Sequence, residues 1–246
     1  MGERWRGQHT VQSDHCDFKK TLRLSTLLEW MQRAGDAHLA ENGILLDDMI
    51  EKGMAWMLVT IDLELDRLPR YGETMEILSW HKGSKGVQWF RDFRLYGEDQ
   101  EQIGQCRTVW VLVDIHKRRI LRSTAFPYTL PEMRSDSVGD APGKVEIPAD
   151  AVFEYNYRMT VRQSSLDMNG HMNNARFADI CLDALTPEQL EADIARFHIT
   201  YHQEALLGQE ICVSRTAVAE DACYITGSTS EGIRSFDACL TFRRKK

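Results

Sequence analysis

The second half of this 246-residue sequence repeats the organisation of its first half. In the first half, a helical pattern at residues 24–40 precedes strand-like runs at 55–68, 74–81, 87–96 and 103–115. In the second half, a strand at 152–161 precedes a helix at 173–185 and strands at 195–206, 210–219, 223–229 and 233–242. The turn at Gly72 aligns with the turn at Gly208, an offset of 136 residues, and residues 67–77 align with 203–213. Repetition of this kind indicates a tandem duplication of one structural unit.

Each repeat has the pattern of one helix packed on an antiparallel sheet. The first helix has apolar residues at spacings of three and four, with Ser25 or Thr26 as the expected N-cap and Gly43 closing it. Its apolar stripe is wide, which predicts a helix wrapped by a sheet. Residues 10–20 could hold one short strand, and Pro187 is expected to open a short helix. These features predict an α+β fold with two long helices.

Four of the six prolines lie between residues 127 and 148, in a polar stretch with weak periodicity. Such a composition is typical of a linker. We therefore predict a first domain at residues 1–125, a linker at 126–150 and a second domain at 151–246.

Composition excludes several classes of function. The net charge of −7 and pI near 5.6 argue against a nucleic-acid partner. No apolar run approaches the ~18 residues of a membrane span and no signal peptide is evident, so we expect a cytoplasmic protein away from membranes. The six cysteines are scattered without a C-x-x-C pair, which predicts reduced thiols, no disulfides and no structural zinc.

A loop rich in chemical groups precedes the second helix. Residues 167–174, Asp-Met-Asn-Gly-His-Met-Asn-Asn, combine a carboxylate, an imidazole and three amides around Gly170. An alternative is an ordinary helix start, with Asn173 or Asn174 as N-cap and Asp167 and Asn169 as turn formers. The stretch before the first helix has no Asn-x-His, so only one repeat is expected to be catalytic.

Residues 165–174 closely resemble the signature loop of acyl-acyl carrier protein thioesterases of plant plastid and bacterial types. Residues 201–204, Tyr-His-Gln-Glu, resemble a second catalytic segment of that family, and residues 56–72 and 108–114 resemble its N-terminal domain. The resemblance covers about residues 10–243 and implies a tandem double hotdog fold. Hotdog thioesterases that act on coenzyme A esters share only an Asp-x-x-x-His-x-x-Asn skeleton with the loop.

The resemblance implies hydrolysis of fatty acyl-acyl carrier protein to free fatty acid, which terminates fatty acid synthesis, without a cofactor. It implies a catalytic set of Asp167, Asn169, His171 and Glu204. Asp167 would lie closest to the reacting carbonyl, as nucleophile or as water activator, and Glu204 would polarise or hold the water. Many plant members have a cysteine after the glutamate, whereas Ala205 follows Glu204 here, so a thiol nucleophile is not expected at this place.

Binding residues follow from the same resemblance. Backbone N–H groups at Asn173 and Asn174 would offer an oxyanion site at the helix start. The first domain would shape the acyl pocket, with candidate contacts that are otherwise plain core residues: Leu27, Trp30, Met31, Met57 and Trp89. The acidic carrier protein would dock on one of several basic clusters. A homodimer is possible, and chain-length preference is left open.

Three rival hypotheses remain. His198, His202 and Glu204 share one face of a strand and could serve a metal hydrolase, although same-face neighbours ~6.6 Å apart are widely spaced for one ion. The fold could also be a non-catalytic acyl-binding module. Finally, the reaction could be kept with coenzyme A as the carrier, as in an acyl-CoA thioesterase of hotdog type.

Overall fold

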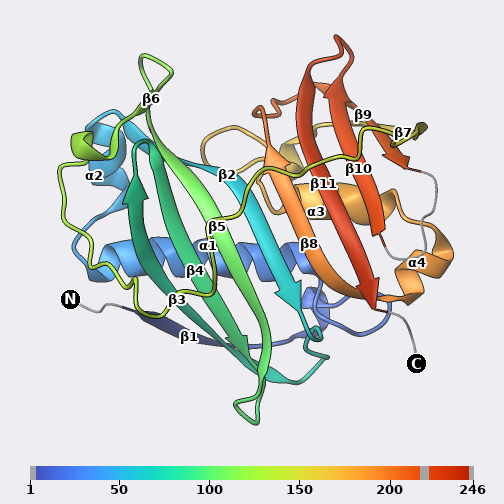
Figure 1. The fold of residues 1–246 in the computed structure, drawn as a ribbon, viewed down its shortest axis with the longest axis horizontal. Helices are drawn as coiled ribbons and strands as arrows, with labels where there is room; N and C mark the ends of the chain where they lie inside the picture. Colours follow the sequence, from blue (N-terminus) through green and yellow to red (C-terminus); the bar gives the residue numbers. More distant parts are fainter. Residues whose placement is uncertain (1–3, 217–221, 244–246) are drawn as a thin grey trace. The chain divides into compact units, whose positions relative to one another are not determined.

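The computed structural model describes residues 4–216 and 222–243. The chain divides into two compact units, Met1–Pro142 (unit 1) and Gly143–Lys246 (unit 2). The division falls inside residues 126–150, the stretch that we predicted as a linker. Each unit is an antiparallel sheet packed on a helix, and its path is given below unit by unit (Figure 1).

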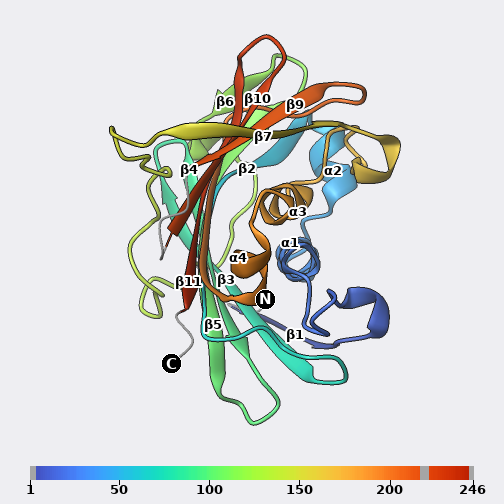
Figure 2. The ribbon, with the colours of Figure 1, turned by 90° about the vertical axis from the view of Figure 1, so that its right-hand side faces the viewer.

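Unit 1 has strands in the order β1-β3-β4-β5-β2, with β6 paired to β5. All of its strand pairs are antiparallel. The long helix α1, Leu24–Glu41, lies on one face of this sheet and is seen end-on in Figure 2. The strands are β1 Trp5–Thr10, β2 Met54–Leu65, β3 Thr74–Lys85, β4 Gln88–Tyr96, β5 Gln102–Asp114 and β6 Arg119–Leu121.

The wide apolar stripe of α1 explains its position. Leu24, Leu27, Leu28, Met31 and Ala34 are all buried against the sheet. The helix begins at Leu24, so the N-cap expected at Ser25 or Thr26 is wrong, and both side chains are buried inside the first turn. The prediction that Gly43 closes the helix is confirmed, because Gly43 adopts φ of +76° just after the C-cap residue.

Short elements of unit 1 were missed or misplaced. The first strand lies at Trp5–Thr10 rather than within residues 10–20, and a short helix, α2 at Leu46–Glu51, was not predicted. Single turns of 3₁₀ helix lie at Ser13–His15 and Ser123–Ala125.

Unit 2 has strands in the order β8-β11-β10-β9-β7, all antiparallel. Its helix α3, Arg176–Asp183, has only eight residues, so the expectation of a second long helix is wrong. Thr186 caps a new helix, α4 at Pro187–Glu191, immediately afterwards. The strands are β7 Phe153–Thr160, β8 Asp193–Tyr201, β9 Glu210–Thr216, β10 Ala222–Thr229 and β11 Arg234–Arg243. The predicted strand 210–219 extends into residues 217–219, which lie outside the described residues.

The segment 126–150 contains no helix or strand, yet its ends are packed. Phe126 is buried in a cluster of unit 1, with its ring 5.3 Å from that of Trp56 and 5.1 Å from that of Trp89. In unit 2 the N–H of the buried Val145 donates to Thr200 Oγ1 at 2.9 Å. Within the part of the chain that the structure describes, no helix is long and apolar enough to cross a bilayer.

Candidate active site

The loop between β7 and α3 is organised by one carboxylate oxygen. Asp167 Oδ1 accepts the backbone N–H of Asn169 at 2.8 Å and that of His171 at 3.4 Å. The Asp167 N–H donates back to the His171 carbonyl at 2.8 Å. Gly170 completes the turn at φ of +78°, a left-handed conformation that glycine adopts without strain. The turn leaves the Asn169 side chain exposed.

The same loop is joined to the segment after β8. The Met172 N–H donates to the Ala205 carbonyl at 2.8 Å, and His171 forms a β-bridge with Leu206. This pairing brings His171 Nε2 to 3.4 Å from Glu204 Oε2, with both side chains partly buried. The structure therefore brings Glu204 to the loop of Asp167 and His171, and these three residues were predicted as one site although Glu204 is distant in the sequence.

The start of α3 satisfies most of its own backbone groups. Asn173 Oδ1 accepts the Ala175 N–H at 2.8 Å, which is the cap geometry of the simpler interpretation of this loop. The Asn174 carbonyl accepts the Tyr201 hydroxyl at 2.9 Å. Among residues 169–176, the Asn174 N–H is the one backbone donor without a partner in the described part of the chain. It is the donor at this helix start that remains for an oxyanion.

Unit 1 contains the same loop conformation without the same side chains. Asp17 Oδ1 accepts the N–H groups of Lys19 at 2.9 Å and Thr21 at 3.0 Å, as Asp167 does for Asn169 and His171. The Leu22 N–H donates to the Pro69 carbonyl, as Met172 donates to Ala205. The sequence comparison missed this loop because it lies 150 residues before its counterpart, whereas the glycine turns are separated by 136.

The two loops differ at the second carboxylate oxygen. In unit 1, Asp17 Oδ2 accepts the Thr21 hydroxyl at 2.9 Å. In unit 2 the corresponding residue is His171, which pairs with Glu204. Asp167 Oδ2 consequently has no hydrogen-bond partner among the residues that the structure describes. The position of Glu204 is taken by Leu68 in unit 1, so of these two described loops it is the one in unit 2 that has both an open carboxylate oxygen and a histidine.

The histidines proposed for a metal site have other partners. His198 Nε2 lies 3.0 Å from the Gly143 carbonyl, and His202 Nε2 lies 2.8 Å from Asp237 Oδ2. Within residues 4–216 and 222–243 there is no group of three His, Cys, Asp or Glu side chains that could hold one ion. All six cysteines are free thiols.

The five residues that we predicted to contact the acyl chain lie in different parts of unit 1. Leu27, Trp30 and Met31 are buried on α1, and the Trp30 ring stacks on His9 at 4.4 Å. Met57 is 36% exposed, whereas Trp89 is 7% exposed. Of these five residues, Trp89 is the one that lines the cavity of unit 1.

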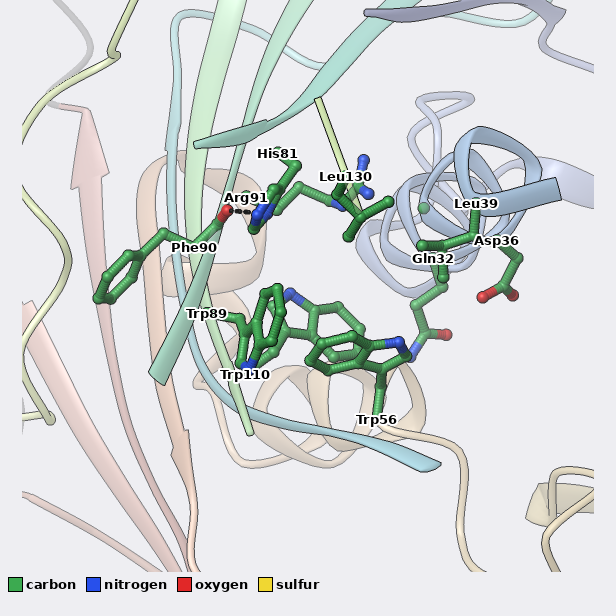
Figure 3. Close-up of a pocket in the computed structure, with 11 residues that line it drawn as sticks. Gln32, Asp36, Leu39, Trp56, His81, Trp89, Phe90, Arg91, Trp110 and Leu130 are labelled. Atoms are coloured by element: carbon green, nitrogen blue, oxygen red, sulfur yellow. Dashed lines mark hydrogen bonds between the residues drawn. The ribbon is translucent and has the colours of Figure 1, made fainter. Parts of the chain in front are cut away.

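This cavity is partly open to solvent, and its non-atom space of about 460 Å³ includes some of that solvent. Figure 3 shows it between α1 and strands β2–β5. Its lining is Gln32, Gly35, Asp36, Leu39, Trp56, His81, Trp89, Phe90, Arg91, Trp110 and Leu130. The sequence analysis missed the polar members, although Arg91 and Asp92 interrupt an aromatic run and are a visible signal.

Family models match most of the chain. Residues 2–125 match the acyl-ACP thioesterase N-terminal domain, and residues 150–235 match the acyl-ACP thioesterase C-terminal domain.

Curated relatives carry related names. A chloroplastic acyl-[acyl-carrier-protein] hydrolase of Cuphea viscosissima is 24% identical over 234 residues, which are 87% of this chain and 55% of the relative. A chloroplastic palmitoyl-acyl carrier protein thioesterase of Cuphea hookeriana is 22% identical over 218 residues, which are 81% of this chain and 51% of the relative. The chain thus spans about half the length of these relatives.

Solved structures share the fold. An acyl-ACP thioesterase from Bacteroides thetaiotaomicron superposes with a TM-score of 0.81 at 21% identity, covering 98% of each chain. The 12:0-ACP thioesterase from Umbellularia californica superposes with a TM-score of 0.79 at 19% identity, covering 100% of this chain and 99% of that one. The predicted α+β fold of two hotdog units is confirmed.

Proposed function

The chain belongs to the acyl-ACP thioesterase family, and we propose that it hydrolyses fatty acyl-acyl carrier protein to free fatty acid and carrier protein. This reaction would end fatty acid elongation. One observation supports the proposal beyond family membership: in unit 2 the loop that contains Asp167, with its unpartnered Oδ2, also contains the His171 that pairs with Glu204, whereas the equivalent loop of unit 1 has threonine in place of His171 and no open oxygen on Asp17.

In the proposed reaction, Asp167 activates a water molecule, and the backbone at the start of α3 stabilises the oxyanion. Asp167 Oδ2 takes a proton from a water molecule, whose oxygen attacks the thioester carbon. The Asn174 N–H donates to the oxygen that becomes negative in the tetrahedral intermediate, with the Asn169 amide as a second donor. The carbon–sulfur bond then breaks, and the sulfur takes a proton from His171, which is held by Glu204. Water thus supplies the new oxygen of the product acid.

We assign the two units different tasks. Unit 2 carries the reaction, and unit 1 contributes the cavity that takes the acyl chain. Trp89 remains our candidate for a chain contact, and Asn173 holds the helix start that presents the Asn174 N–H. Leu27, Trp30, Met31 and Met57 lie outside the cavity lining and serve the core or the surface in this proposal.

The partner in this proposal is an acylated, acidic carrier protein. The net charge of −7 makes a general attraction to an acidic partner unfavourable, so docking has to use a local basic cluster. A cytoplasmic location and a homodimer remain predictions from the sequence.

The decisive experiment is steady-state hydrolysis of acyl-carrier-protein thioesters of graded chain length, beside the matching coenzyme A esters. We expect the carrier-protein esters to be preferred and His171→Ala to lower kcat/KM by ~10²–10⁴-fold. Thr21→Ala is the matched control, because it changes the equivalent residue of the non-catalytic loop, and it should leave kcat/KM unchanged.

Other outcomes would revise the proposal. Equal use of coenzyme A esters would assign a broader thioesterase. If folded wild type hydrolyses neither ester, the protein is an acyl-binding module and the enzymatic proposal is wrong.

A further inference from the structure

The cavity of unit 1 is lined by hydrogen-bond donors that have no acceptor. Most of its lining is apolar or aromatic, including Leu39, Leu130 and three tryptophans. Figure 3 shows the indoles of Trp56, Trp89 and Trp110 gathered on one side, with Gln32 and Asp36 of α1 across from them. A cavity shaped only for a plain alkyl chain would not need unpaired donors in its wall, because burying them without partners is costly.

Arg91 is the first of these donors. Its side chain is buried, the residue being 8% exposed, and its Nη1 donates to His38 Nδ1 at 3.2 Å and to Ser79 Oγ at 3.0 Å. Its Nε and Nη2 have no acceptor, and no carboxylate lies within 4.0 Å, among the residues that the structure describes. Burial lowers the pKa of Arg91 to about 10, so the guanidinium keeps its charge at neutral pH.

The indole nitrogens divide into paired and unpaired ones. Trp110 Nε1 donates to Thr108 Oγ1 at 2.8 Å. Trp56 Nε1 and Trp89 Nε1 are both inaccessible to solvent and have no partner among the described residues. Their rings pack edge to face, with centroids 4.8 Å apart, so both unpaired N–H groups belong to one aromatic wall.

The hydrogen-bond acceptors of the lining are not paired with these donors. Burial, and then the charge of Arg91, lower the pKa of His81 to about 3, so its ring is neutral. Its Nδ1 lies 3.2 Å from the Phe90 carbonyl and must carry the proton, because a carbonyl oxygen only accepts. The one carboxylate of the lining, Asp36, lies beyond ion-pair distance of Arg91 but interacts with its charge, and burial raises the pKa of Asp36 while Arg91 opposes that rise. The interior therefore keeps unpaired donors on Arg91, beside one ring nitrogen, His81 Nε2, that can only accept.

We propose that this cavity binds acyl chains that carry an oxygen acceptor, namely a hydroxyl, oxo or terminal carboxyl group, in preference to unsubstituted chains. Arg91 is the specificity-determining residue, since its unpaired N–H groups are the ones that such an oxygen satisfies, whereas the indole N–H groups of Trp56 and Trp89 are enclosed within the wall. The apolar lining takes the rest of the chain. This inference rests on the proposed function, because it is the acyl thioester substrate that brings a chain to the protein.

The test measures binding separately from hydrolysis. In a His171→Ala background, N-acetylcysteamine thioesters of one chain length are titrated in unsubstituted, 3-oxo, 3-hydroxy, ω-hydroxy and ω-carboxy forms. Quenching of tryptophan fluorescence reports the cavity, and calorimetry gives Kd. At least one oxygenated form should bind roughly 10-fold more tightly than the unsubstituted thioester, as expected for one recovered hydrogen bond. The preferred form identifies where the oxygen lies.

One substitution and two controls assign the preference to Arg91. Arg91→Met keeps a long apolar side chain without charge or donors, and it should reduce the preference to about one-fold. Trp89→Phe removes an N–H that is enclosed in the wall, and Trp110→Phe removes one that is already paired, so neither should change the preference. Circular dichroism and thermal unfolding confirm that each variant folds, and Arg91→Leu replaces Arg91→Met if that variant does not fold.

The outcomes separate this proposal from the proposed function. If wild type hydrolyses carrier-protein thioesters but oxygenated and unsubstituted forms bind equally, the cavity proposal is overturned and the hydrolase stands. If wild type hydrolyses nothing while oxygenated thioesters bind more tightly and Arg91→Met removes the difference, the cavity proposal stands and the hydrolase fails.

Discussion

At the scale of single residues, the two oxygens of the Asp167 carboxylate have different surroundings. Oδ1 holds the turn through two backbone N–H groups, and Oδ2 is left open. The comparison with Asp17 is informative, because that residue holds the same turn in unit 1 but gives its second oxygen to Thr21. The turn therefore needs Oδ1 of Asp167, whereas the proposed reaction needs Oδ2. A substitution can change one of these roles and leave the other.

We expect Asp167→Asn to keep the turn and lose the reaction. The amide oxygen can still accept the two N–H groups, so the unfolding midpoint should change little. An amide cannot take a proton from water, so kcat should fall by ~10²–10⁴-fold. Asp17→Asn is the matched control and should leave kcat unchanged. Detection by mass spectrometry of an acyl group esterified to Asp167 in wild type would contradict water activation and assign a nucleophile.

Acid sensitivity of unit 1 should originate at His81. Burial lowers the folded-state pKa of this histidine to about 3, below its ordinary 6.5. Between these values the unfolded chain binds a proton that the folded chain excludes, so stability is full above pH 6.5 and falls as the pH drops toward 3. The slope from this one group is about 1.4 kcal/mol per pH unit.

His81→Asn tests this origin, because asparagine can still donate to the Phe90 carbonyl but does not titrate. Urea unfolding at several pH values between 6 and 4 should show a shallower loss of stability in the variant. Identical slopes for variant and wild type would show that His81 is not the group responsible.

The sequence predicted part of the site at this scale. Asp167, His171 and Glu204 were predicted from two short motifs; the structure puts His171 and Glu204 3.4 Å apart, and their roles stay predictions. The loop of Asp17 was missed because a turn is specified by one carboxylate and by backbone conformation, and it is the non-glycine residue Lys20, at φ of +61°, that takes the place of Gly170. The Asn174 N–H was predicted as an oxyanion donor together with that of Asn173. The sequence does not tell which backbone N–H groups at a helix start are already hydrogen-bonded.

At the scale of elements, alternation predicted the long strands to within a few residues, because each buries one face of a sheet. The runs at 74–81 and 87–96 correspond to β3 and β4, although β3 extends to Lys85. The run at 195–206 overshoots β8, which ends at Tyr201. Short elements such as α2 and β6 were missed, because six or three residues are too few to establish a period.

Gly35 lies in α1 and lines the cavity, so a side chain added there would favour the helix but take space from the acyl chain. A Cβ at this position would lie 3.7 Å from Arg91 Nε, an ordinary contact, and Gly35 lines the cavity. We expect Gly35→Ala to stabilise the protein by ~0.5–1 kcal/mol through helix propensity, while it weakens binding of the bulkier acyl chains. Urea unfolding and the chain-length profile of kcat/KM measure the two effects. A loss of stability would show that the space over Arg91 is needed by the fold.

Gly227 in β10 should behave in the opposite way. A Cβ there would overlap Cε1 of Phe236, the buried residue that faces it on β11. Because Phe236 is fully enclosed, we expect Gly227→Ala to lower the unfolding free energy by ~1–3 kcal/mol. A variant as stable as wild type would mean that the Phe236 ring moves aside freely.

At the scale of the whole molecule, the repeat predicted two similar units, and the structure has two compact units of the same design. The difference in offset, 150 residues at the loops and 136 at the glycine turns, shows that the first copy has the longer helical region. That region includes α1 with 18 residues, against 8 in α3, together with α2. A strict repeat therefore could not predict the length of the second helix.

Limited proteolysis should detect the division between the units. Phe126 and Val145 are buried, whereas Arg134 and Lys144 are exposed and lie between them in a stretch without helix or strand. Trypsin at low concentration should cut first at these two residues and give fragments that end near the division at residues 142 and 143. Mass spectrometry of the first products identifies the cuts. First cleavage within a strand of either unit would contradict this picture.

The turn that both units share has a consequence for how such a protein can change over time. The copy of the turn in unit 1 retains its acidic residue but has threonine in place of the histidine. Selection for a reaction at this turn therefore does not constrain that unit. If unit 2 carries the proposed hydrolytic step, mutations in the cavity of unit 1 can accumulate and be selected for new ligands without changing that step. Because of the duplication, one unit can vary in sequence without loss of the loop in the other unit. The range of ligands that the protein binds is the property that such variation can change first.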